Sequence, residues 1–101
     1  MSGYHTRWDI PAEDREHPDY TAAGKRLVFG KAVYDCRAQL GLTEAELGEH
    51  AGLTEDQVEA IETGGTEPTL ELILALARAM NAAVRLDPDG ATPIRFEIRA
   101  A

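Results

Sequence analysis

The sequence predicts a mainly helical domain of four to five helices that closes with a short C-terminal β-hairpin. Apolar residues recur at three- and four-residue steps across residues 21–81, the period of an amphipathic helix. Twice in that stretch a threonine is followed three residues later by Glu or Gln, a capping box that marks a helix start. Over residues 82–101 the period changes to two, as in half-buried strands.

Composition places the chain among globular proteins. Its 101 residues suit one domain with a single core, and 44% of them are hydrophobic. The lone Cys36 excludes an internal disulfide and fits a reducing compartment. No apolar run approaches the roughly 20 residues of a membrane span, and the N-terminus lacks the apolar core of a signal peptide. We therefore expect a cytoplasmic protein with no membrane partner.

Residues 1–20 are polar, acidic and interrupted by prolines, so we expect a flexible N-terminal segment. Its bulky side chains are Tyr4, Trp8 and Ile10. They are candidates to anchor the segment on a partner protein, although aromatic residues incidental to a frayed terminus would look the same.

The first two helices have readable ends. Apolar spacing predicts a first helix over residues 21–40, which stops at Gly41. Thr43 is the expected N-cap of the second helix, and Glu46 completes its capping box. That helix is expected over residues 44–51.

The third helix follows a tight turn. Gly52 breaks the second helix, and Thr54 with Gln57 forms the next capping box. The third helix is expected to run to about Thr63, before two glycines. Small Gly48 lets the second and third helices cross closely.

The fourth helix, over residues 70–80, is unusually apolar. One of its faces carries Leu70, Ile73, Leu74, Ala77 and Met80, and that face is widened by Leu72 and Leu76. A stripe this wide fits either an oligomer interface or a broad contact with the core, and the pattern leaves both open.

Residues 82–101 predict the hairpin. Apolar and charged residues alternate on both sides of Asp87-Pro88-Asp89-Gly90, a strong turn signal. An isolated two-stranded hairpin is only marginally stable in water, so it must lie on the helices or pair with a second copy. We expect a homodimer whose shared sheet buries one apolar face made of Val84, Leu86, Ile94, Phe96 and Ile98.

The second and third helices together have the spacing of a helix-turn-helix. Glycines allow the crossing and the turn, and apolar residues anchor both helices, so that the third stands proud enough to enter a major groove. The core is expected to contain Leu47, Leu53, Val58, Ile61, Leu70, Ile73 and Leu76.

A family resemblance rests on residues 39–80, QLGLTEAELGEHAGLTEDQVEAIETGGTEPTLELILALARAM. They resemble the lambda-repressor-like (Cro/C1, or XRE) helix-turn-helix domain, and the likeness is closest to antitoxins of the HigA type. GGTEPTLELILALARAM and the strand Ala83-Val84-Arg85-Leu86 carry that second likeness. The resemblance implies a dimer that binds an operator upstream of its own genes and neutralises a toxin ribonuclease.

Charge opposes this reading. Residues 43–71 contain nine carboxylates and no Lys or Arg, whereas DNA binding draws much of its strength from basic side chains that displace counterions. Operator binding is therefore expected to be weak. Members of the resembled family usually carry Gln where this chain has Glu44 and Glu55. The candidate DNA-contacting residues are Thr43, Glu44, Thr54, Glu55, Asp56, Gln57, Ala60 and Thr66.

Two functions stay open. The first is a DNA-binding transcriptional regulator, the antitoxin and autorepressor of a type II toxin–antitoxin pair. The second is a helix-turn-helix scaffold whose acidic surface meets a basic partner protein such as a toxin. An enzyme is not expected, nor a cofactor or metal, because the histidines lack metal-ligand spacing and no glycine-rich phosphate loop follows a strand.

Overall fold

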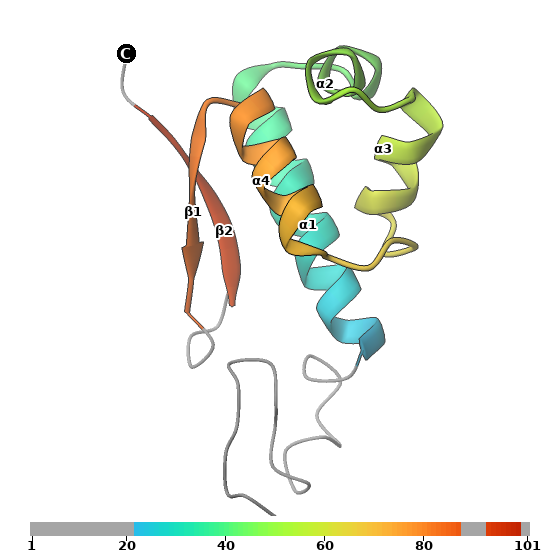
Figure 1. Ribbon diagram of the computed structural model, residues 1–101, viewed down its shortest axis with the longest axis vertical. Coiled ribbons are helices and arrows are strands. Elements are labelled where there is room, and N and C mark those ends of the chain that lie inside the picture. Colours follow the sequence, from blue (N-terminus) through green and yellow to red (C-terminus); the bar gives the residue numbers. More distant parts are fainter. Residues whose placement is uncertain (1–21, 88–92, 100–101) are drawn as a thin grey trace, which may run out of the picture.

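The computed structural model describes residues 22–87 and 93–99, which form four helices and a two-stranded antiparallel sheet (Figure 1). The elements are α1 (Ala22–Leu40), α2 (Glu44–Ala51), α3 (Glu55–Glu62), α4 (Leu70–Ala79), β1 (Ala82–Leu86) and β2 (Ile94–Ile98). The predicted mainly helical fold with a C-terminal hairpin is confirmed. Tyr4, Trp8 and Ile10 lie outside the described residues, as does most of the hairpin turn. None of the helices described is long and apolar enough to cross a membrane.

Side-chain hydrogen bonds begin α2 and α3 where the sequence predicts. The Thr43 hydroxyl accepts from the backbone N–H of Glu46 at 3.0 Å, and the Thr43 N–H donates to the Glu46 carboxylate at 2.8 Å. Thr54 and Gln57 repeat the arrangement at 3.1 and 2.8 Å. Each box satisfies two backbone groups that a helix end otherwise leaves unpaired. Both predicted capping boxes are confirmed.

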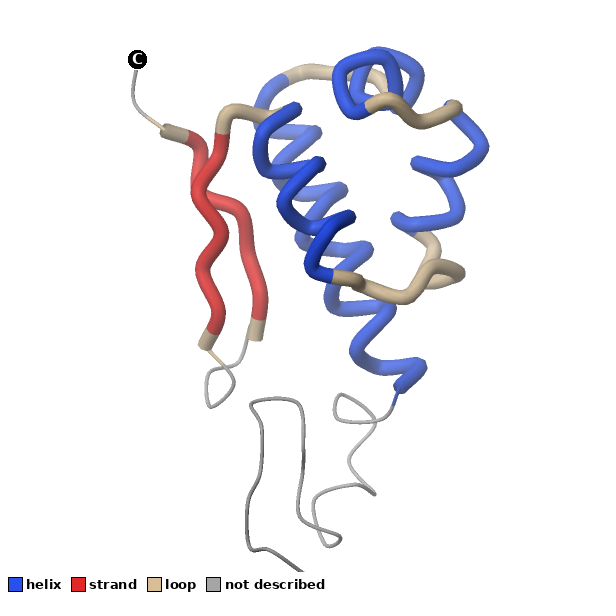
Figure 2. Tube along the Cα trace, viewed as in Figure 1, coloured by secondary structure: helices blue, strands red, loops and turns tan. Residues whose placement is uncertain are grey.

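One core cluster draws side chains from all six elements. Helices α1 and α4 run through the middle of the molecule, with the hairpin on one side and the α2–α3 pair on the other (Figure 2). Burial of Cys36 in α1 raises the pKa of its thiol, as expected for an apolar position. The largest fully buried side chains are Phe29, Val33, Cys36, Leu47, Val58, Ile61, Leu76, Met80 and Ile94.

The core prediction for α4 needs one correction. Ile73 and Leu76 are buried as expected, but Leu70 is 69% exposed and does not belong to the core. Leu70, Leu74 and Arg78 recur at four-residue steps and are all exposed, so Leu70 lies on the solvent side of α4. Leu74 is also exposed, so the apolar stripe of α4 is wider than the surface that the core covers. Among the other predicted core residues, Leu53 is half-buried against the cluster and the rest are buried.

The hairpin lies on the helices of its own chain. Val84 pairs with Phe96 and Leu86 with Ile94, so these four side chains share the face that meets α1 and α4. Ile94 and Phe96 are only 1% and 7% exposed. On the other face, Glu97 accepts hydrogen bonds from two arginines, Arg85 at 2.8 Å and Arg95 at 2.9 Å. These arginines hold the pKa of the Glu97 carboxyl below its usual value.

Candidate nucleic-acid interface

The turn between α2 and α3 fixes the two helices at one angle. Gly52 has φ 75°, the left-handed conformation that glycine adopts without steric cost, and the Leu53 N–H donates to the Gly48 carbonyl at 2.8 Å. A Cβ placed on Gly48 would lie 2.6 Å from the Leu53 carbonyl oxygen, closer than real contacts allow. The tight turn predicted at Gly52 is confirmed, and Gly48 lets the turn residues Leu53 and Thr54 pack against α2, so that the pair forms a helix-turn-helix.

An ion pair between Arg37 of α1 and Glu62 of α3 sets how α3 is mounted on the domain. Arg37 donates to the Glu62 carboxylate through Nε at 2.6 Å and through Nη2 at 2.9 Å, and through Nη1 to the Leu42 carbonyl at 2.8 Å. The two side chains are only 14% and 6% exposed. Bidentate pairing of this kind has a strict geometry, so it fixes the end of α3 against α1 and the segment before α2.

Glu44, at the start of α2, adds a second carboxyl group beside this pair. Its pKa is raised, first because burial disfavours its charged form and then because of the nearby Glu62 carboxylate, with a smaller contribution from Glu59. Arg37 acts in the opposite direction. Glu44 was expected to face DNA, but it is half-buried and belongs largely to this charged cluster.

The outward face of α3 is the surface that a major groove would meet. Its inward residues, Val58 and Ile61, are buried in the core, so the opposite side is free of packing. Four of its side chains are exposed, and only one of them is neutral: Glu55, Asp56, Gln57 and Glu59. The predicted contact Ala60 is half-buried on the flank of the helix.

Capping limits what the neutral candidates offer. The hydroxyl oxygens of Thr43 and Thr54 already accept backbone hydrogen bonds, but each hydroxyl still has its own proton to donate. The Gln57 Oε1 accepts from Thr54, which leaves the Gln57 Nε2 group to donate to a base edge. Thr66, in the segment after α3, is half-buried.

The basic side chains lie outside the helix-turn-helix. Residues 21–42 carry a net charge of +3, from four basic residues and Asp35, and the pair Lys31–Asp35 is exposed on α1 at 2.9 Å. Arg26 of α1 donates through Nε to the carbonyl of Gly64, just after α3, at 3.2 Å. This bond ties the start of α1 to the segment just after α3.

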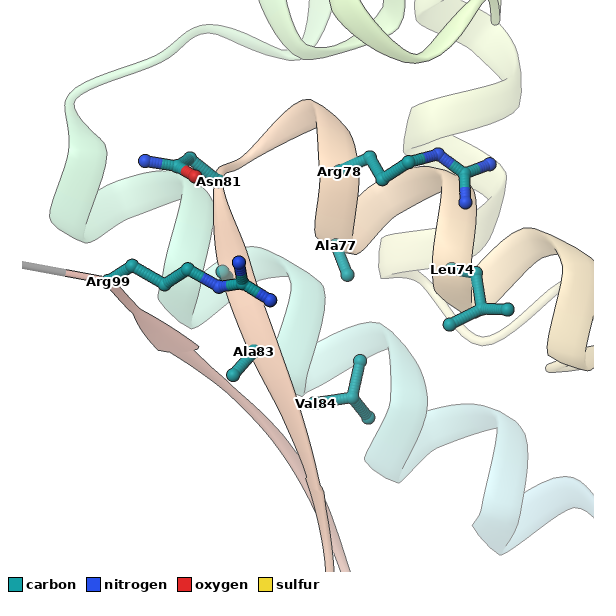
Figure 3. Close-up of a pocket in the computed structure, with 8 residues that line it drawn as sticks. Leu74, Ala77, Arg78, Asn81, Ala83, Val84 and Arg99 are labelled. Carbon is teal, nitrogen blue, oxygen red and sulfur yellow. The ribbon is translucent and has the colours of Figure 1, made fainter.

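Two further arginines line a pocket of about 520 Å³ between α4 and β1. In the close-up, the Arg99 guanidinium reaches over Ala83, and Arg78 extends along the other rim above Leu74 (Figure 3). The floor of the pocket is apolar and includes Ala77 and Val84. This surface belongs to α4 and the hairpin, not to α2 and α3.

The residues predicted to form a dimer interface fall into two groups. Ile94 and Phe96 are buried in the core of their own chain, whereas Leu86 and Ile98 are 48% and 39% exposed. Val84 is half-buried and lines the α4–β1 pocket. A second copy would therefore meet the ends and edges of the hairpin.

Sequence reasoning missed the contacts that hold α3 to α1. Arg37 and Glu62 are 25 positions apart, and neither side chain stands out in its local pattern. Gly30 is a buried glycine of α1 at which a Cβ would collide with the carbonyl of Ile61. A glycine inside an otherwise regular helical pattern is the one signal of such a close approach that the sequence contains. In the described part of the chain, no group of three or more His, Cys, Asp or Glu side chains is placed to hold a metal ion.

Comparison with known proteins agrees with this geometry. Residues 33–85, just over half of the chain, match the profile of a helix-turn-helix family, HTH_3. The structure is similar to the crystal structure of the restriction-modification controller protein C.AhdI from Aeromonas hydrophila, with a TM-score of 0.54 and 28% sequence identity. The match covers 63% of this chain and 91% of that chain. No curated protein matches the sequence.

Proposed function

The chain belongs to the Cro/C1-type helix-turn-helix family, and on that premise we propose that it is a transcriptional regulator that binds its operator weakly. The observation that carries the proposal is the outward face of α3, which is rigidly mounted, free of packing and of a size to enter a major groove. The similarity to a restriction-modification controller supports a regulator.

Within this proposal, α3 reads bases and the helix starts hold phosphates. Gln57 donates through Nε2, and Glu55 accepts from the N4 amino group of a cytosine. The hydroxyls of Thr43, Thr54 and Thr66 donate to phosphate oxygens, which position the protein without reading sequence. Asp56 and Glu59 raise the Coulombic cost of approach, while Ala60 and Glu44 lie at the edges of the contact.

We further propose that the regulator is a homodimer. Leu70 and Leu74 are one helical turn apart on α4, Leu74 and Val84 line the same pocket, and Leu86 follows Val84 on the same strand face. This exposed apolar stripe, with Ile98 and the open strand edges, offers a second copy both burial and backbone pairing. Two copies would present two α3 helices to an operator with two half-sites.

The most specific role we propose is that of antitoxin and autorepressor in a cytoplasmic type II toxin–antitoxin pair. The support is the sequence likeness to HigA-type antitoxins over residues 39–80. Tyr4, Trp8 and Ile10 would anchor the N-terminal segment on the toxin, because bulky apolar side chains supply most of the binding energy at protein interfaces.

The experiment that tests the DNA-binding proposal is a selection of bound sequences from a random duplex library at low salt. The expected result is an enriched motif that loses part of its sequence preference when Gln57→Ala replaces the one outward neutral donor of α3. A matched control, Asp87→Asn, changes an exposed residue of the hairpin and should keep the motif. Recovery of unenriched sequences would argue against sequence-specific binding.

The acidic surface favours a second candidate function, a scaffold for a basic partner protein. Residues 43–71 have a net charge of −9, which opposes binding to a polyanion and favours association with a cationic protein. If this candidate holds, the selection recovers no motif, and the protein instead binds a small basic protein with an on-rate that falls steeply as salt rises.

A further inference from the structure

A pocket with two basic residues lies at the loop that follows α3. Lys25 and Arg26 of α1 line it together with Ala22, Glu67 and Pro68, and its volume is about 360 Å³. The pocket thus joins the second turn of α1 to the loop that connects α3 to α4. In Figure 1, the start of α1 extends past this loop on the side of the molecule that carries α3.

Two contacts join the first turns of α1 to the segment that follows α3. The Arg26 Nε donates to the Gly64 carbonyl at 3.2 Å, two residues after α3 ends. The Leu27 side chain packs against Gly64 so closely that a Cβ there would lie 2.6 Å from Leu27 Cδ2. These contacts place Arg26 and the turn of α1 that carries it against the segment that follows α3.

The dimensions of DNA bring a phosphate strand to this place. Helix α3 has eight residues and is therefore about 12 Å long, close to the roughly 12 Å width of the major groove. Helix-turn-helix proteins read bases with the N-terminal residues of the recognition helix, and in the homeodomain variant the C-terminal end of that helix contacts the sugar–phosphate backbone. The loop after α3, and the pocket attached to it, then face phosphate.

The other cations of the described chain are differently placed. Lys31 and Arg37 lie farther along α1, and Arg85 and Arg95 lie on the outer face of the hairpin beside Glu97. Arg78 and Arg99 line the pocket between α4 and β1. Lys25 and Arg26 are the basic residues of the described part that lie next to the α3–α4 loop.

We propose that this pocket binds a DNA backbone phosphate, and that Lys25 and Arg26 supply the phosphate neutralisation that the helix-turn-helix itself lacks. The proposal rests on the proposed DNA-binding function and names the residues through which it becomes salt-dependent. Arg26 keeps its Nε bond to Gly64 and offers its terminal nitrogens, and Lys25 acts as a point charge. Glu67, on the rim, opposes the phosphate and limits the affinity.

The test measures binding to a short random-sequence duplex by fluorescence anisotropy between about 50 and 200 mM salt, because phosphate contacts are sequence-independent. In a plot of log affinity against log salt, the slope of Lys25→Ala should be smaller than that of the wild type by about 0.9. The ratio of wild-type to variant affinity should therefore change about 3.5-fold between the two ends of that salt range. Lys25→Arg keeps the charge and should restore the slope. Glu67→Gln should strengthen binding and leave the slope almost unchanged, because it adds no cation.

Lys31→Ala is the matched control, since it removes the same charge from the same helix at an exposed site. It should leave the slope of the wild type unchanged, and urea unfolding should show that both lysine variants are folded. If Lys25→Ala behaves like Lys31→Ala while the wild type binds, the pocket is not a phosphate site, although DNA binding stands. If the folded wild type binds no duplex at any salt, the proposed function and this inference both fail.

Discussion

The α2–α3 unit and the α4–hairpin half of the molecule are held together in different ways. In α2 and α3, local features set the geometry: two capping boxes, a left-handed Gly52 and a close approach of the turn to Gly48. The α4–hairpin half depends on burial, because Met80, Ile94 and Phe96 fill the core that they share with α1. The first unit is shaped mainly by neighbours in sequence and the second by distant partners.

The two regions also differ in charge. The outward face of α3 is acidic, whereas the described arginines of α4 and the hairpin lie around a pocket or bind one shared carboxylate. The groups that build the helix-turn-helix are glycines, threonines and buried apolar side chains, and none of them fixes the sign of the exposed surface. Architecture and electrostatics are therefore set by different residues, so a helix-turn-helix can keep its shape while its affinity for DNA changes.

The largest expected effects test whether both halves share one core. Leu47→Ala in α2 and Phe96→Ala in β2 should each lower the free energy of unfolding by roughly 2–5 kcal/mol, because each opens a cavity at a buried site. Leu70→Ala, at a leucine that is exposed in the single chain, should change the stability of the monomer by no more than about 0.5 kcal/mol. Urea unfolding measures all three. A small loss for Phe96→Ala alone would show that the hairpin is not part of the common core.

Breaking the ion pair between Arg37 of α1 and Glu62 of α3 should give the next largest effect on stability. Glu62→Gln removes the charge that Arg37 needs and should destabilise the protein by about 3 kcal/mol, near the low end for buried pairs because Arg37 keeps some contact with water. Lys31→Ala breaks an exposed pair and should cost less than about 1 kcal/mol. Equal losses for the two variants in urea would refute a structural role for the Arg37–Glu62 pair.

A variant of the Thr54 cap tests whether local contacts set the geometry of α2 and α3. Thr54→Ala should cost about 1 kcal/mol, because the backbone N–H of Gln57 at the start of α3 loses the hydroxyl that accepts its hydrogen bond. Thr54→Ser keeps the hydroxyl and should recover most of that stability in thermal unfolding. If Ala and Ser unfold alike, the box contributes little and α3 is held by its core contacts.

The smallest effect concerns the pH dependence of Glu44. Its pKa is raised in the folded state, so the folded protein holds this proton more tightly than the unfolded chain does. The contribution of Glu44 to stability therefore falls as the pH rises from 4.5, the ordinary pKa of a glutamate, through its raised pKa in the folded protein. The loss persists above that pH window. The free energy of unfolding of Glu44→Gln should therefore increase relative to that of the wild type as the pH rises through this window. A stability difference that is constant with pH would contradict the assignment.

The helix ends and the hairpin could be predicted because they depend on residues near one another in the chain. Each helix start is marked within four positions of sequence, by the capping box of Thr43 with Glu46 or of Thr54 with Gln57. The pairing of Arg37 with Glu62 and the approach of Gly30 to Ile61 depend on how α1 and α3 cross, and no local pattern contains that information. Leu70 was wrongly assigned to the core because helical periodicity shows which face of a helix is apolar but not how much of that face the core covers.

The candidate site was predicted less completely than the fold. The exposed positions of Glu55, Asp56 and Gln57 follow from the helical period once Val58 and Ile61 are placed in the core. The partial burial of Glu44 does not follow, because it depends on Glu62 of another helix. The separation of Ile94 and Phe96 from a dimer surface was equally hidden, since strand alternation fits a face covered by helices as well as one covered by a second copy.

The most direct test of the central claim, that an intact helix-turn-helix carries an electrostatically weakened DNA surface, is the salt dependence of duplex binding by the wild type and Glu55→Gln. The wild type should bind weakly, with a shallow slope, because few phosphates are neutralised. Glu55→Gln should bind more tightly with nearly the same slope, since it removes repulsion but adds no cation, while Asp87→Asn on the hairpin should change neither. Nanomolar binding by the wild type at physiological salt, or no gain from Glu55→Gln, would contradict the claim.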